Sequence, residues 1–180
     1  MTTALALPST EEEIWRYSRI NELDMSKFAN GKLTTTVEGG EGVQLTGAAA
    51  TALVGAGMHV QPDMFAQMNT DTPDVIALQI GKNKVHTQTV VITHSVDKSG
   101  IVAYPRLVID AAENSEIVVV ERFTSVDNVH SLVVPVVEVH AAQSARVTYL
   151  AINELGKNTW QIGHQVAVGE RDSNVRLFTV

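Results

Sequence analysis

From residue 75 onward, short apolar runs alternate with stretches of turn residues. Nine runs are rich in Val, Ile, Leu or Thr, which are common in β-strands. No long pattern with helical spacing separates one run from the next. This pattern predicts a mainly β body rather than strands alternating with helices. The runs cover residues 75–80, 89–93, 107–109, 117–120, 132–134, 136–139, 146–150, 165–168 and 175–178.

Part of this region repeats. Residues 109–118 align with residues 139–148 at an offset of 30, and residues 167–176 form a looser copy at an offset of about 28. Each copy holds a strand, a turn of small residues, a few polar residues and a second strand. A recurring unit of this size is typical of a stacked solenoid. A sandwich of hairpins is the alternative, but the period and the absence of Asn-Gly and Asp-Gly turns in this region favour the solenoid.

The first residues carry a helix start signal. Ser9 and Glu12 have the spacing of a capping box, in which the Glu12 side chain reaches back to the Ser9 amide. Glu11, Glu12 and Glu13 fall in the first turn, where the helix dipole favours acids. We therefore predict a helix near residues 9–20, with Trp15 and Tyr17 anchoring it to the body or to a partner.

A second short helix is predicted near residues 62–69, with Pro62 at its first position. Its apolar residues, Phe65 and Met68, are expected to face inward. Met64 lies four residues before Met68, and we expect the pair to fill a core rather than to bind metal. The predicted organisation is an N-terminal region over residues 1–74 and the opening coils of a β-helix over residues 75–180.

Composition excludes several functions. The chain has 180 residues, 13 Lys and Arg, 20 Asp and Glu and a net charge of −7, so it is poorly suited to binding nucleic acid. It has no cysteine, so it forms no disulfide, thiolate nucleophile or Cys-ligated cluster of its own. The least polar stretch, residues 47–60, is too short to span a bilayer. The first residues lack the basic start of a secretory signal, so we expect a cytoplasmic protein without membrane contact.

Several segments resemble, in the same order, the SufB/SufD family of SUF iron–sulfur cluster assembly proteins, and within it SufD. Residues 12–17 (Glu-Glu-Ile-Trp-Arg-Tyr) resemble the Glu-Glu-Trp-Arg-Tyr stretch near the start of SufD, with Ile14 inserted. Residues 65–69 resemble the short helix before the family's β region. Four further groups of residues resemble the first part of its β-helix: 90–95, 105–109, 114–116 and 119–123.

This resemblance implies a scaffold subunit that acts with SufB and the ATPase SufC, on which a cluster is built before transfer. It also implies a right-handed parallel β-helix that follows a small helical region. No catalytic, cofactor-binding or metal-binding residue is carried over, and the cluster is expected to be handled by the assembled complex. The final run, residues 175–180, ends without a cap, so we expect a longer natural chain and a possible homo-oligomer through the open end of the β-helix.

The six histidines are candidate site residues. None of the six forms a His-x-His or His-x-x-x-His pair. His140 falls one repeat after Asp110, which predicts a hydrogen-bonded structural pair between coils. A role of His94 or His164 in cluster chemistry is the minor alternative. The chain has no P-loop and no Gly-x-Ser-x-Gly motif, so we expect no enzymatic activity.

A β-solenoid that binds carbohydrate or acts on polysaccharide is the alternative function. Such enzymes place clustered acids along one exposed sheet. The candidate acids Asp110, Glu138 and Glu154 fall at different positions of the repeat, which disfavours this alternative.

Overall fold

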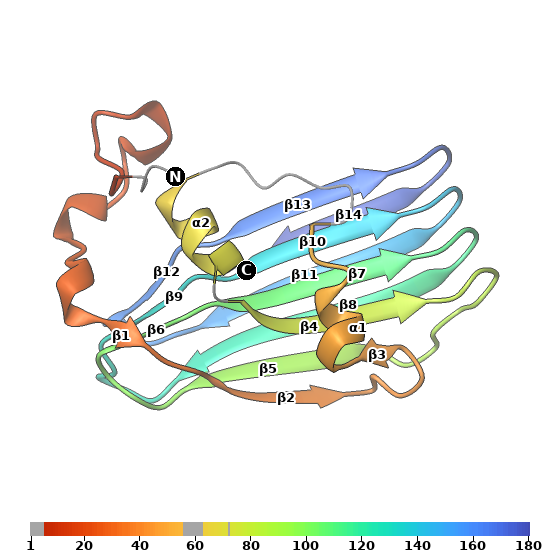
Figure 1. Cartoon of the computed structure of the whole chain (residues 1–180), viewed down its shortest axis with the longest axis horizontal. Coiled ribbons are helices and arrows are strands. Elements are labelled where there is room, and N and C mark those ends of the chain that lie inside the picture. Colours follow the sequence, from red (N-terminus) through yellow and green to blue (C-terminus); the bar gives the residue numbers. More distant parts are fainter. Residues whose placement is uncertain (1–5, 56–62, 72) are drawn as a thin grey trace.

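The computed structural model describes residues 6–55, 63–71 and 73–180. Most of the chain winds into a parallel β-solenoid of about four turns, so the predicted mainly β fold and solenoid architecture are confirmed (Figure 1). Each complete coil contributes one strand to each of three sheets, and successive coils pair in parallel.

The strands follow this order along the solenoid. The first coil holds β4 (Asp74–Ile80), β5 (Val90–Val96) and β6 (Ile101–Ala103). The second holds β7 (Pro105–Ala111), β8 (Glu116–Ser125) and β9 (Ser131–Val133). The third holds β10 (Val136–Ala141), β11 (Arg146–Glu154) and β12 (Thr159–Gln161), and the fourth holds β13 (His164–Gly169) and β14 (Asn174–Thr179).

Three short N-terminal strands complete the sheets at the first coil. β1 (Ala29–Asn30) pairs parallel to β6, whereas β2 (Thr34–Glu38) and β3 (Gln44–Leu45) pair antiparallel to β5 and β4. We call the sheet β3-β4-β7-β10-β13 sheet 1, the sheet β2-β5-β8-β11-β14 sheet 2 and the sheet β1-β6-β9-β12 sheet 3. The N-terminal strands therefore cover the strand edges with which the solenoid begins.

Strand register reproduces the sequence repeat. Ile109 pairs with Val139 at an offset of 30, and Val139 pairs with Ala167 at an offset of 28. Leu78 precedes Ile109 in the same row, and Leu78, Ile109 and Val139 are all fully buried inside the coils. Burying one such side chain contributes roughly 1.5–3 kcal/mol, so each added coil extends the same core. The aliphatic positions therefore face the lumen, as the alternation predicts.

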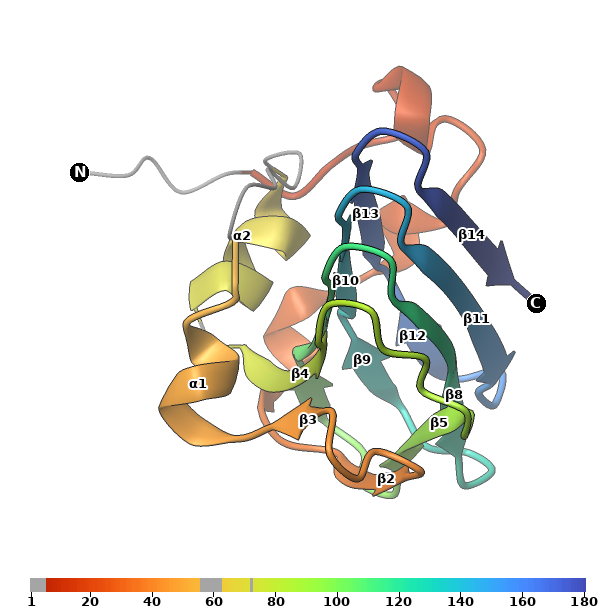
Figure 2. The same cartoon turned by 90° about the vertical axis from the view of Figure 1, so that its right-hand side faces the viewer.

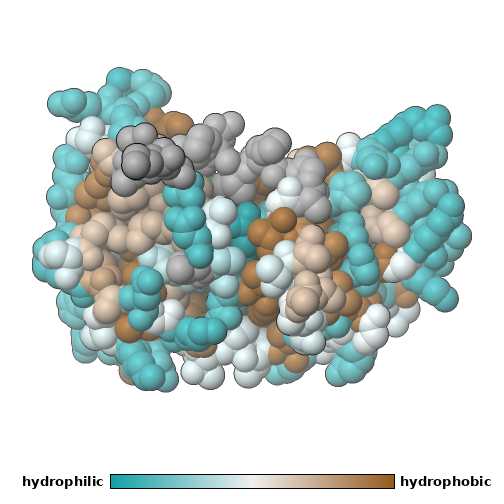
Figure 3. Space-filling model, in the orientation of Figure 1, coloured by the Kyte–Doolittle hydropathy of each residue, from teal (hydrophilic) through white to brown (hydrophobic). Residues whose placement is uncertain are grey.

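The turns that follow the strands of sheet 1 share one backbone feature. Asn83, Asn114, Ser144 and Asp172 have positive φ angles of 58°, 54°, 61° and 61°. Asn and Asp tolerate this left-handed conformation better than most residues. Asn114 Nδ2 also donates to Asn83 Oδ1 of the preceding coil at 3.0 Å. These turns stack at one end of the molecule, where Figure 3 shows hydrophilic side chains gathered.

The predicted helix near residues 9–20 is wrong. The chain instead forms separate 3₁₀ turns at Glu13–Trp15, Ile20–Glu22 and Met25–Lys27. The predicted capping contact does form, since the Ser9 amide donates to Glu12 Oε1 at 3.0 Å. The helix does not continue because Ser18 binds the local backbone: its hydroxyl donates to the Trp15 carbonyl at 2.7 Å and accepts from the Ile20 amide at 3.3 Å.

The two aromatic residues of this segment, Trp15 and Tyr17, lie in different environments. Trp15 packs against Phe65 with ring centroids 5.8 Å apart, so it anchors the segment as predicted. Tyr17 is 94% exposed and Ile14 is 90% exposed, so neither contributes to packing against the body. A 3₁₀ turn does not place these residues on one helical face, which explains the difference.

Two short α-helices lie outside sheet 1, α1 (Gly47–Thr51) and α2 (Met64–Asp71) (Figure 2). α2 corresponds to the helix predicted near residues 62–69, although its start differs, and Pro62 lies outside the described residues. The Asp63 side chain accepts from the Ala66 amide at 2.8 Å and so caps the first turn. Phe65 is fully buried, and Met64 and Met68 pack against the same core, as predicted.

Candidate functional site

A row of polar side chains runs from the exposed edge strand β2 into the solenoid interior. Thr35 of β2, His94 of β5, Glu121 of β8 and Tyr149 of β11 come from four neighbouring strands of sheet 2. Thr35 Oγ1 lies 2.9 Å from His94 Nδ1, and His94 Nε2 lies 2.9 Å from Glu121 Oε1. The Tyr149 hydroxyl donates to Glu121 Oε2 at 2.5 Å. We call these four residues the lumen row.

Glu121 is the centre of the lumen row. It occupies an inward position between Val119 and Phe123, and only 1% of it is exposed. Its partners in the strand register are Ile92 and Ala151, which offer it no hydrogen bond from their side chains. An unpaired carboxylate in such surroundings would cost several kcal/mol. The hydrogen bonds with His94 and Tyr149 therefore offset the free-energy cost of burying this carboxylate.

The neighbours of Glu121 define where the protons lie. Burial raises the pKa of Tyr149, and the adjacent Glu121 charge raises it further, so the phenol stays protonated and acts as a donor. We assign the second donor from its partner: the His94 Nε2 proton faces the carboxylate, which leaves Nδ1 to accept from Thr35. The His94 ring also stacks on Phe123, with centroids 5.0 Å apart. The row is thus held by both hydrogen bonds and packing.

Each end of the lumen row borders a cavity. Thr35 and His94 line a cavity of about 200 Å³ beside the N-terminal strands. Tyr149 lines a second cavity of about 240 Å³ beside the last coil, where Gln165 Nε2 donates to Thr179 Oγ1 at 3.1 Å. The polar row therefore connects the two ends of an interior that is otherwise mainly aliphatic.

A second buried polar cluster lies on the outer face of sheet 1. Arg106 Nε donates to Glu138 Oε1 at 2.5 Å, and the Gly55 amide donates to Glu138 Oε2 at 2.8 Å. Asn69 of α2 accepts from Arg106 at 3.1 Å and donates to the backbone carbonyls of Pro105 and Val134. These bonds fix α2 and the end of the α1 segment to the solenoid. The cluster is therefore structural.

The predicted contact between His140 and Asp110 forms. The two residues pair in register between β7 and β10, and His140 Nδ1 lies 2.9 Å from Asp110 Oδ1. Gln79 of the preceding coil donates to Asp110 Oδ2 at 2.9 Å. In the part of the chain that the structure describes, no group of three or more His, Cys, Asp or Glu could hold a metal ion.

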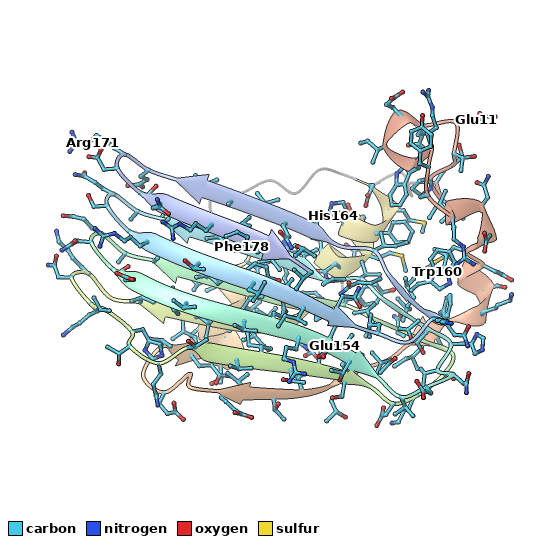
Figure 4. All side chains as sticks on the ribbon, turned by 180° about the vertical axis from the view of Figure 1, so that it is seen from behind. Glu11, Glu154, Trp160, His164, Arg171 and Phe178 are labelled. Carbon is cyan, nitrogen blue, oxygen red and sulfur yellow. The ribbon has the colours of Figure 1, made fainter. Side chains whose placement is uncertain are left out.

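His164 borders the cavity that Tyr149 lines, but its hydrogen-bond partner is Asp63 and not a residue of the lumen row. It stands at the start of β13, and its Nε2 is 3.1 and 3.2 Å from the two Asp63 carboxylate oxygens (Figure 4). Partial burial alone would raise the pKa of Asp63, but hydrogen bonds from His164 and from the Ala66 amide lower it below its usual value. His164 therefore links α2 to the fourth coil.

Of the acids considered for a polysaccharide enzyme, Asp110 and Glu138 lie on the outer side of sheet 1, where Glu138 is fully buried, and Glu154 lies on sheet 2. Asp110 bonds to His140 outside sheet 1, Glu138 is buried beside Arg106, and Glu154 lies on sheet 2, where it pairs with Arg122. They form no shared acidic row. The alternative function on carbohydrate is not supported.

His94 is a candidate on sequence grounds, whereas the role of Glu121 appears only in the structure. One signal was available: in the run from Val119 to Phe123, strict alternation places Glu121 on the same face as its apolar neighbours. The contribution of Thr35 could not be read from spacing, because the pairing of β2 with β5 is not part of the repeat. Tyr149 pairs in register with Val119, so its contact with Glu121 is diagonal and does not follow from the repeat offset.

The comparisons with known proteins agree with this architecture. The family model described as SUF system FeS cluster assembly, SufBD core domain, matches residues 78–180. The match begins inside β4 and extends through β14, which is more than half of the chain. No curated protein and no solved structure matched the chain. No helix among residues 6–55, 63–71 and 73–180 has the length and apolar character needed to cross a membrane. The chain therefore belongs to the SufBD core-domain family of the SUF system and takes part in iron–sulfur cluster assembly.

Proposed function

We propose that this chain is a non-catalytic scaffold subunit of the SufD type, which acts in the cytoplasm with SufB and the ATPase SufC. The family match supports the pathway. The Trp15-Arg16-Tyr17 neighbourhood, which resembles SufD, supports the choice between the two paralogues. In this proposal the nascent cluster is the cargo of the complex, and this chain binds no cofactor of its own.

The observation that best supports the scaffold role is the complete hydrogen bonding of the buried polar groups in the described residues. Among the residues that the structure describes, no buried side-chain nitrogen or oxygen lacks a hydrogen-bond partner. The buried charges of Glu121 and Glu138 are each held by partners within the chain. With no cysteine in the sequence, these 180 residues offer no thiolate ligand for a cluster. These features suit a rigid support better than a reactive site.

The test is complex formation with purified components. The tagged natural protein would be co-expressed with SufB and SufC from the same organism and isolated under mild conditions. We expect the three proteins to co-elute in one complex, with ATP hydrolysis that requires SufC and is absent when this chain is assayed alone. Failure to retain SufB and SufC, with each protein folded by circular dichroism, would contradict the proposal.

A further inference from the structure

A polar cleft lies between the N-terminal 3₁₀ turns and the loops that precede the strands of sheet 3. Two cavities, of about 310 and 160 Å³, make up this cleft, and both are lined by Glu22, His130, Asn158 and Trp160. Figure 4 shows Trp160 beside the N-terminal turns. Because pockets for small ligands occupy about 300–1,000 Å³, the cleft has room for a small molecule.

Hydrogen bonds fix the solenoid side of the cleft. Gly100, His130 and Asn158 border it from three successive coils, and each lies one residue before a strand of sheet 3. The His130 amide donates to Ser99 Oγ at 3.1 Å, and the His130 carbonyl accepts from the Gly100 amide at 2.7 Å. The Thr159 hydroxyl donates to a backbone carbonyl of the preceding coil at 2.8 Å. This wall is therefore preorganised for a ligand.

On the N-terminal side, ion pairs neutralise both acids of the cleft. Arg19 donates to Glu22 through Nε at 3.0 Å and through Nη2 at 2.5 Å. Lys27 Nζ lies 3.7 Å from Asp24 Oδ2. Arg19 also lies over the Trp160 ring, 5.6 Å from its centroid, and its Nη1 group has no partner in the part of the chain that the structure describes. Arg19 therefore keeps donors for a further acceptor.

The solenoid side adds donors that no acceptor of the chain uses. Lys157 is exposed in the turn before β12 and forms no ion pair with any residue that the structure describes. Within the same residues, the side chains of His130 and Asn158 form no hydrogen bond. Gln161 accepts from Asn153 at 2.6 Å through Oε1, so its amide protons remain available. Donors therefore converge on the cleft from both of its walls.

The charge of the cleft is opposite to that of the whole chain. Its three cations, Arg19, Lys27 and Lys157, face the two acids Glu22 and Asp24, so one positive charge is unbalanced. The whole chain has a net charge of −7. An anion is therefore the ligand that this cleft suits, because it would supply the missing acceptors and balance the charge.

We propose that the cleft binds a small organic polycarboxylate, which holds the N-terminal turns against the solenoid. One carboxylate accepts from Lys157, and a second accepts from Arg19 on the opposite wall. Trp160 borders both cavities and offers apolar surface to the carbon skeleton, a contact that an inorganic anion cannot make. Because the walls come from residues 19–28 and 157–161, binding would join segments that are far apart in the chain. This inference goes beyond the scaffold role.

Calorimetric titration with citrate tests the site, and inorganic phosphate is the comparison. We expect the natural protein to bind citrate at millimolar or lower concentrations and to bind phosphate about tenfold more weakly or worse. Absence of citrate binding would overturn the proposal. Equal affinity for the two anions would show that the carbon skeleton contributes nothing, which also contradicts it.

Matched lysine variants test the charge. Lys157→Glu should weaken citrate binding about tenfold or more, whereas Lys157→Arg keeps the charge and should stay within about threefold of the wild type. Lys84→Glu is the control, because Lys84 is also exposed and has no ion pair among the described residues. It lies between β4 and β5, at the opposite end of the coils (Figure 1). Equal losses in Lys157→Glu and Lys84→Glu would mean that net charge alone governs binding, against the proposal.

Hydrogen exchange locates the bound citrate. We expect it to slow amide exchange in residues 19–28 and 157–161 but not in residues 81–89, and to raise the melting temperature by mass action. Protection confined to other segments would refute the assignment of this cleft. Circular dichroism would verify that each variant is folded. Because these measurements use this chain alone, their failure is distinct from failure to bind SufB and SufC.

Discussion

At the scale of single residues, Glu121 sets the character of the interior. A carboxylate at an inward position of an aliphatic strand is stable only with donors on both of its oxygens, and His94 and Tyr149 supply them. Each donor comes from a different coil. The lumen row therefore ties neighbouring coils together by a directional contact that aliphatic packing alone does not provide.

Removing one donor tests the contribution of the lumen row. Tyr149→Phe keeps the buried ring but leaves Glu121 Oε2 without its partner, so we expect the free energy of unfolding to fall by about 1–3 kcal/mol. Urea denaturation would measure the change. Tyr104→Phe is the control, because its hydroxyl makes only a 3.4 Å contact with Asn30 and should change stability by less than about 0.5 kcal/mol. Equal effects of the two variants would contradict this role of Tyr149.

At the scale of secondary-structure elements, the stacked turns fix the strand register. Residues with positive φ recur at the same place in successive coils, including Asn83 and Asn114. Because a one-residue slip would turn the aliphatic face of a strand outward, a turn of fixed length and conformation keeps each coil aligned with the last. The turns therefore recur from coil to coil in this chain, as the strands do.

Substitution at Asn114 separates backbone conformation from side-chain bonding. Asn114→Gly and Asn114→Val both lose the hydrogen bond to Asn83, but only Val is strained at a φ of 54°. We expect Asn114→Val to be less stable than Asn114→Gly by about 1–2 kcal/mol, measured by chemical denaturation. If the two variants were equally stable, backbone strain would not be the reason for Asn at this position.

At the scale of the whole molecule, the N-terminal segment and the solenoid form one body. β1, β2 and β3 add to the sheets at the first coil, while α2 reaches the fourth coil through Asp63 and His164. Asn69 fixes the same helix to the second and third coils through Arg106 and the Val134 carbonyl. Contacts between distant parts of the sequence therefore stabilise the coils along the length of the solenoid.

The link between Asp63 and His164 predicts a dependence on pH. A carboxyl group whose pKa is lowered by folding adds stability above its unfolded pKa, near 3.9, and this stability is lost as pH falls through the folded pKa. We expect the wild type to be more stable than Asp63→Asn at pH 6 and the difference to shrink below about pH 4. Urea denaturation at several pH values would measure it. A difference that is constant down to pH 2 would refute the assignment.

Local pattern was sufficient for the repeating part of the fold. The apolar runs identified the strands of sheets 1 and 2 in each coil and β9 of sheet 3, but not the short strands β6 and β12. The offsets of 30 and 28 gave the pairing of Ile109 with Val139 and of Val139 with Ala167. The same register placed His140 beside Asp110. A solenoid is predictable in this way because each coil contacts mainly its neighbours, so one sequence period specifies most of its contacts.

The remaining features depend on contacts that no period encodes. β2 holds three threonines, one valine and one glutamate, and it becomes a strand only because β5 offers an unpaired edge. The segment around Trp15 forms 3₁₀ turns as it packs on Phe65. The lumen row likewise required four strands to be in place before Thr35, His94, Glu121 and Tyr149 could meet. The sequence by itself determined the coil and its register, through side-chain alternation. Only the tertiary structure decided how the first coil is covered and which polar groups share the interior, because those contacts join residues far apart in the chain.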